Sequence, residues 1–74
     1  MSKLQILTDA EPTLEFLQSA VGGYIEIINV DDGQLIVNEE GMIRGLEHNH
    51  DASMVAGHPV VGDAVLLKEE AQLQ

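Results

Sequence analysis

The chain has 74 residues, a mass of 8.0 kDa, a formal net charge of −10 and no cysteine. A chain of this length forms one domain and buries only about 60% of the surface that its unfolded state exposes, so its core is small. The lack of cysteine excludes disulfides and thiolate metal sites. An excess of 13 acidic over 3 basic side chains disfavours direct binding to nucleic acid or anionic membranes.

The sequence contains neither the apolar run of a signal peptide nor one long enough to span a membrane, so we expect a cytoplasmic protein. Hydrophobic residues make up 45% of the chain, which is too high for a disordered acidic segment. We therefore expect a folded domain over residues 1–68, followed by a solvated tail over residues 69–74, where the apolar pattern ends.

The N-terminal third predicts a strand followed by a helix. Lys3–Leu7 alternates weakly between apolar and polar residues, which favours a short strand. Asp9–Pro12 is typical of a helix entry, because proline suits the first turn and acidic side chains favour the positive end of the helix dipole. Apolar residues at i, i+3 and i+7 spacing within Thr13–Val21 predict an amphipathic helix, and Gly22-Gly23 ends it.

The middle of the chain predicts a β-hairpin. Tyr24–Val30 is rich in β-branched residues, Asp31–Gly33 carries the Asp-Gly turn signal, and Gln34–Asn38 follows as the partner strand. The alternation places Ile25 and Ile27 on one face of the first strand and Tyr24, Glu26, Ile28 and Val30 on the other. Apolar residues on both faces indicate burial on both, which a chain of this size supplies poorly.

The last third predicts shorter elements. Glu39–Gly41 breaks the hairpin, and Met42–Leu46 permits a third short strand around Arg44 and Gly45. Asp51 is suited to capping a short helix over Ala52–Ala56, and Ala64–Leu67 predicts the last strand. The resulting order is β-α-β-β-(β)-α-β, an α+β fold with a small antiparallel or mixed sheet, one main helix and one short helix.

Three segments together resemble a family of uncharacterised proteins. VGGYIEI (Val21–Ile27), NEEGMIRGL (Asn38–Leu46) and VGDAVLL (Val61–Leu67) occur in this order. They resemble a small family of phage and bacterial proteins, actinobacterial ones included, that carries a domain-of-unknown-function label. The resemblance implies a cytoplasmic accessory protein, often phage-encoded, with no known reaction. Asn49 matches an Asn-Pro-type turn of that family, but His50 stands where the family commonly has proline.

Histidines and carboxylates gather in Glu47–Asp51, with His58 farther along the chain. Imidazole and carboxylate groups are ligands for Zn²⁺ and other transition metals, and His48 and His50 point the same way in an extended segment. The competing interpretation is a polar loop that leads into a helix. We favour the loop, because the histidines fall where the chain departs from the family pattern.

Asn38–Gly41 is a second candidate site. Glu39 and Glu40 could act as general acid and base only if the fold drove their pKa values apart. Because neighbouring residues on an extended chain point to opposite faces, the two carboxylates do not readily share one catalytic pocket. We therefore favour a turn in which Asn38 bonds to nearby backbone. Arg44 could bind a phosphate or carboxylate, but pairing with Glu39 or Glu40 is the simpler expectation.

We predict a non-enzymatic accessory protein of phage type that acts as a homo-oligomer and binds a host protein or sequesters a small molecule, without cofactor. One alternative is an acidic decoy that imitates DNA and occupies a nucleic-acid-binding host protein. A metal-dependent hydrolase is a weaker alternative. No residue is singled out as catalytic. Candidate binding residues are Tyr24, Glu26, Asn38, Glu39, Glu40, Arg44, Asn49 and Asp63, and the weak metal candidates are His48, His50 and His58.

Overall fold

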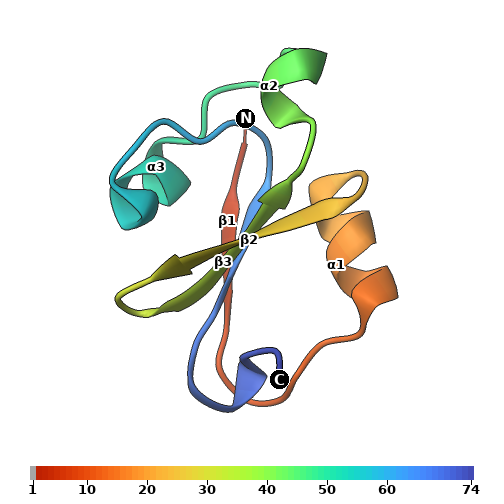
Figure 1. Ribbon diagram of the computed structural model, residues 1–74, viewed down its shortest axis with the longest axis vertical. Coiled ribbons are helices and arrows are strands. Elements are labelled where there is room, and N and C mark those ends of the chain that lie inside the picture. Colours follow the sequence, from red (N-terminus) through yellow and green to blue (C-terminus); the bar gives the residue numbers. More distant parts are fainter. Residues whose placement is uncertain (1) are drawn as a thin grey trace.

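The computed structural model describes residues 2–74 as a four-stranded mixed sheet with a helix on each face (Figure 1). The strands are β1 (Leu4–Leu7), β2 (Ile25–Val30), β3 (Gly33–Asn38) and β4 (Ala64–Leu67). The helices are α1 (Leu14–Val21), α2 (Gly41–Arg44), α3 (His50–Ala56) and a 3₁₀ turn, η1 (Glu69–Ala71). The predicted α+β fold is confirmed. Within residues 2–74, no helix has the length and apolar character that crossing a membrane requires.

The sheet order is β1-β4-β3-β2, so the first two strands in the sequence form the two edges. β1 pairs with β4 in parallel, whereas β4 with β3 and β3 with β2 are antiparallel pairs. Consequently β1, β2 and β4 begin at the same end of the sheet, and β3 ends there. This shared end carries the segments that connect to α1, α2 and α3 (Figure 1).

The core consists of two apolar layers, one on each face of the sheet. Leu17 and Val21 of α1 pack on the face that includes Ile36. Ala52 of α3 packs on the opposite face, which includes Leu35. All four residues of β4 are buried, because this central strand has neighbours on both sides and a helix over each face.

The predicted helix and hairpin are confirmed with small changes in their bounds. The Thr13 side chain accepts a hydrogen bond from the Phe16 N–H at 3.1 Å, and α1 ends at Gly22 in the left-handed conformation. Gly33 lies at φ 147° where β3 begins, and a Cβ there would collide with the carbonyl oxygen of Leu67. The turn therefore needs glycine both for its backbone angle and for its closeness to β4.

The third strand expected over residues 42–46 is wrong, because this segment forms the single-turn helix α2. Having passed the end of the sheet, it has no strand beside it, and its backbone groups bond locally instead. The Arg44 N–H donates to the Glu40 carbonyl at 2.9 Å, and Gly45 ends the turn at φ 68°.

Two further expectations are corrected. The cap of α3 is Asn49 rather than Asp51: the Asn49 side-chain oxygen accepts from the Ala52 N–H at 3.0 Å, so the helix begins at His50. Residues 69–74 are not a solvated tail. Ala71 is fully buried against the α1 face and Leu73 packs beside it, because the chain turns back over the core after β4.

Candidate functional site

The three motif segments converge at one end of the sheet. Val21–Ile27 joins α1 to β2, Asn38–Leu46 leads out of β3 through α2, and Val61–Leu67 enters β4. The start of β2, the end of β3 and the start of β4 all lie at this end (Figure 1). Most of the candidate binding residues are therefore brought into one region. Some of them form hydrogen bonds that hold the fold together, and the others are exposed to solvent.

Asn38 is a structural residue that joins α1 to the turn after β3. It is 5% exposed, its amide nitrogen donates to the Val21 carbonyl at 3.0 Å, and its oxygen accepts from the Glu40 N–H at 2.7 Å. A Cβ on Gly23 would lie 3.0 Å from the Asn38 amide nitrogen, so the Gly-Gly pair leaves room for this contact. The prediction of a turn based on Asn38 is confirmed.

Arg44 also supports this junction. Its guanidinium donates to the Gly22 carbonyl at 3.0 Å, so it reaches the carbonyl end of α1. Within residues 2–74 neither Glu39 nor Glu40 pairs with it, and the expected ion pair is wrong. The reason is that α2 turns the Arg44 side chain toward α1 rather than along a strand beside the glutamates.

Asn49 joins three segments at the neighbouring corner of the sheet. It is 1% exposed, and its amide nitrogen donates to the carbonyls of Lys3 at 3.0 Å and Gly62 at 2.8 Å. The Asp63 carboxylate accepts from the Lys3 N–H at 2.9 Å. Asn49 and Asp63 thus hold the start of β1 against the start of β4, and they are occupied with backbone partners rather than available to a ligand.

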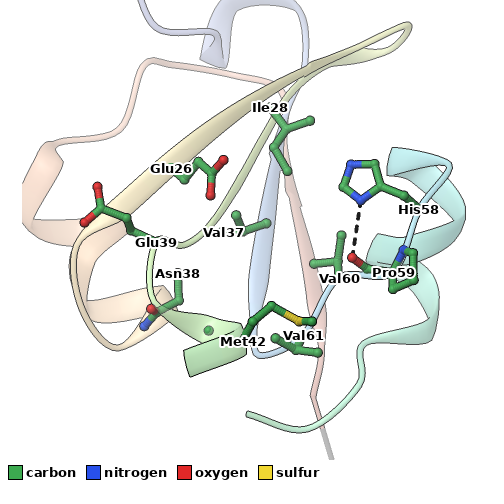
Figure 2. A pocket seen from close by; sticks show the side chains of 11 residues that line it. Glu26, Ile28, Val37, Asn38, Glu39, Met42, His58, Pro59, Val60 and Val61 are labelled. Atoms are coloured by element: carbon green, nitrogen blue, oxygen red, sulfur yellow. Dashed lines mark hydrogen bonds between the residues drawn. The ribbon is translucent and has the colours of Figure 1, made fainter. Parts of the chain in front are cut away.

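A groove opens on the α3 side of this end, between the β2-β3 hairpin and the segment after α3 (Figure 2). Its volume is about 170 Å³. Ile28, Val37 and Val60 form an apolar floor, Met42 lies at one end, and Glu26 and His58 lie on opposite sides (Figure 2). The complete lining is Glu26, Ile28, Val37, Asn38, Glu39, Gly41, Met42, His58, Pro59, Val60 and Val61.

Large apolar side chains are exposed on the segments that form this groove. Met42 is 74% exposed and Ile43 is 87% exposed, both on α2. Tyr24 is 71% exposed, and its carbonyl accepts from the Glu39 N–H, which places it opposite a residue of the lining. The groove and these side chains form the one region where the predicted candidates Tyr24, Glu26 and Glu39 remain exposed together.

The three histidines are separated by the fold. His48 pairs with Val61 in an isolated bridge, His50 begins α3, and His58 lines the groove. His48 and His50 do border a shallow hollow together with Asp51. Even so, no group of three or more histidine, aspartate and glutamate side chains in residues 2–74 is placed to hold a metal ion.

Sequence reasoning missed the groove floor and the exposure of α2. Val37 and Val60 lie 23 positions apart in the sequence, with α2 and α3 between them, so no local pattern indicates that both line the same groove. The pattern of Met42–Leu46 permits a third short strand, but Met42 and Ile43 lie exposed on the helical turn α2. The sequence signal for this exposure is that Met42 and Ile43 are adjacent apolar residues that directly follow the turn ending at Gly41.

One comparison with known proteins identifies a family. A family model described as a domain of unknown function, DUF3846, matches residues 2–73. The chain belongs to the DUF3846 family. This confirms the resemblance to a domain-of-unknown-function family, and it extends the DUF3846 domain over the C-terminal turn that packs on α1. No curated protein and no solved structure matched the chain significantly.

Proposed function

We propose that this protein is a small non-enzymatic accessory protein that works by binding another protein, and that it acts as a homo-oligomer. The observation that carries the proposal is the high exposure of three large apolar side chains on the segments that form one groove: Met42 in its lining, Ile43 next to it on α2, and Tyr24, whose carbonyl pairs with the Glu39 N–H. Soluble monomers rarely expose large contiguous apolar patches, and such patches commonly mark interaction sites. The phage-type setting and cytoplasmic location are part of this proposal.

The groove favours contact with a protein over enclosure of a small molecule. Ligand pockets usually measure about 300–1,000 Å³, and the volume here is about 170 Å³. Its two carboxylates belong to the exposed residues Glu26 and Glu39. An open, shallow groove bordered by exposed apolar side chains suits the surface of a partner protein.

Self-association is supported by the free edge of the sheet at β2. The Glu39 N–H donates to the Tyr24 carbonyl, so in this antiparallel pair every second residue from Tyr24 onward directs its backbone groups toward β3. The residues between them, Ile25, Ile27 and Asn29, direct their backbone N–H and carbonyl groups away from β3, toward the open edge. Ile27 is 45% exposed, and Glu26 is the single charged residue of β2. A six-residue edge strand with a single charged residue is a template for pairing with another strand.

The oligomer is tested by gel filtration with light scattering at micromolar concentration. We expect the wild-type protein to elute as an oligomer, and Ile27→Lys to shift it toward monomer by placing charge at the β2 edge. Ile6→Lys is the matched control, because Ile6 is 55% exposed on the opposite edge strand and the charge change is the same. A strictly monomeric wild-type protein would remove this part of the proposal.

Partner binding is tested by affinity capture from host lysate followed by mass spectrometry of proteins and small molecules. We expect the wild-type chain to retain a protein that the double variant Met42→Ser, Ile43→Ser does not retain. Retention of a small molecule without a protein would contradict the proposal. Salt-sensitive capture of a DNA-binding protein, unaffected by this double variant, would favour the DNA-mimic alternative instead.

A further inference from the structure

The groove combines an apolar floor with an acidic border. Val37 and Val60 are 6% and 5% exposed, so they lie at the bottom and offer little surface to water. Glu26 comes from β2 and Glu39 from the turn after β3, and both residues are exposed; the Glu26 carboxylate points toward the floor, whereas the Glu39 carboxylate points outward at the hairpin side (Figure 2). Carboxylates beside a low-dielectric apolar surface attract cations more strongly than carboxylates surrounded by water.

These two carboxylates are not neutralised within the protein. Among the side chains of residues 2–74, neither the Glu26 nor the Glu39 carboxylate has a hydrogen-bond or ion-pair partner. Arg44, the cation nearest to them in sequence, donates to the Gly22 carbonyl instead. The charge on this side of the groove is therefore available to a partner.

We propose that the groove binds a segment of a partner protein in which an apolar side chain is flanked by lysine or arginine. This proposal rests on the protein-binding function proposed above and names the chemistry of the partner. The apolar side chain lies on the floor between Val37 and Val60, and the basic side chains pair with Glu26 and Glu39. A cavity of about 150 Å³ holds a benzene molecule, so the 170 Å³ of this groove suits one aromatic or branched side chain.

Charge argues against a second copy of this chain as the occupant. Each copy carries a net charge of −10 and only 3 basic side chains, of which Arg44 is already engaged. Bringing an acidic copy into the groove sets its carboxylates against Glu26 and Glu39, and like charges at a close interface repel each other. The groove and the β2 edge are thus assigned to different partners, a basic protein segment and a second copy respectively.

The proposal is tested by selecting a random twelve-residue peptide library, displayed on phage, against the immobilised full-length protein. We expect the enriched peptides to share an apolar residue with lysine or arginine beside it. The binding of one enriched synthetic peptide is then measured by fluorescence anisotropy at low and high salt. We expect weaker binding at high salt, because exposed charge pairs are screened.

Charge reversal locates the binding site. The double variant Glu26→Lys, Glu39→Lys is expected to lose about tenfold or more in peptide affinity, equivalent to about 1.4 kcal/mol. Glu11→Lys, Glu70→Lys is the matched control: it changes the net charge equally, at two exposed glutamates outside the groove lining, and it should bind nearly as well as the wild type. If charge reversal disturbs folding by circular dichroism, Glu26→Gln, Glu39→Gln repeats the test with a smaller expected loss.

Peptide contacts are mapped by amide chemical shifts in NMR spectra. Shifts centred on Ile28, Val37 and Met42 support the groove as the binding site. The proposal is overturned by selected peptides without basic residues, by equal affinity of the groove and control variants, or by the failure to select any peptide. If the protein still captures a partner and still forms an oligomer in those cases, the binding function stands and only the assignment of the groove fails.

Discussion

The two buried asparagines hold neighbouring corners of the same end of the sheet, but the surfaces around them differ. At the Asn49 corner, the amide donates to two carbonyls and caps α3, and Asp63 bonds to the adjoining backbone. At the Asn38 corner, a similar set of contacts supports α2, yet the apolar side chains of Met42 and Ile43 remain exposed. The polar residues of the first corner are engaged in holding the fold together, whereas at the second corner the exposed apolar side chains of α2 contribute no such contact within residues 2–74 and are assigned to binding.

The largest effect is expected from Asn49→Ala. The change leaves the Gly62 carbonyl without its donor, removes one of the two donors to the Lys3 carbonyl (the other is the Ala64 N–H) and removes the cap of α3. A buried group that loses its partner costs about 1–3 kcal/mol and a lost cap about 1 kcal/mol, so we expect a loss of about 3 kcal/mol or more in the free energy of unfolding. Urea denaturation measures it, with the exposed Asn29→Ala as control. A loss within about 0.5 kcal/mol would contradict the role given to Asn49.

Asn38→Ala should have a smaller effect, about 2 kcal/mol. It removes one donor, to Val21, and one acceptor, for Glu40, and the residue is slightly more exposed than Asn49. Urea denaturation again gives the free energy of unfolding, and amide hydrogen exchange should show faster exchange in α2. If Asn38→Ala cost more than Asn49→Ala, the ranking of the two corners would be reversed.

Gly23→Ala tests the close packing at the Asn38 corner. The added Cβ would lie 3.0 Å from the Asn38 amide nitrogen and 3.3 Å from the Arg44 guanidinium, so we expect a loss of about 1 kcal/mol. In a protein that already carries Asn38→Ala, the new Cβ at position 23 meets a smaller side chain. The loss in the free energy of unfolding caused by Gly23→Ala should therefore fall toward zero, which a double-mutant cycle measures. Strict additivity of the two changes would show that the Gly23–Asn38 contact carries no energy.

The smallest effect on stability is expected from the double variant Met42→Ser, Ile43→Ser. Both side chains are mostly exposed, so the midpoint of thermal unfolding should remain close to that of the wild-type protein. Partner capture should nevertheless be lost. A large fall in stability would instead show that α2 contributes to the fold, and it would end the contrast between the two corners.

The hairpin, α1 and β4 could be predicted because their signals are local. The Asp-Gly turn in residues 31–33, the apolar spacing of Leu14, Leu17 and Val21, and the uninterrupted apolar run of Ala64–Leu67 each specify one structure within a few residues. The roles of Asn38 as a turn residue and of Gly22 as a helix end follow from the same kind of local chemistry.

The remaining features depend on partners distant in the sequence. Asn49 bonds to Lys3, 46 residues away, and the Leu73 N–H bonds to the Gln34 side chain, 39 residues away. Neither contact leaves a signal in the local pattern. The segment at Met42 and Ile43 has the β-branched and apolar character of a strand, but no strand lies beside it and it forms a helical turn.

The sequence by itself determined the fold class, the main helix, the hairpin and the family, because periodicity, turn chemistry and ordered motifs are local properties of the chain. It also specified the excess of acidic over basic side chains. Only the tertiary structure decided which motif residues are held by backbone partners and which face a groove. That distinction depends on which strand ends meet, and the order β1-β4-β3-β2 brings together segments that are widely separated along the chain.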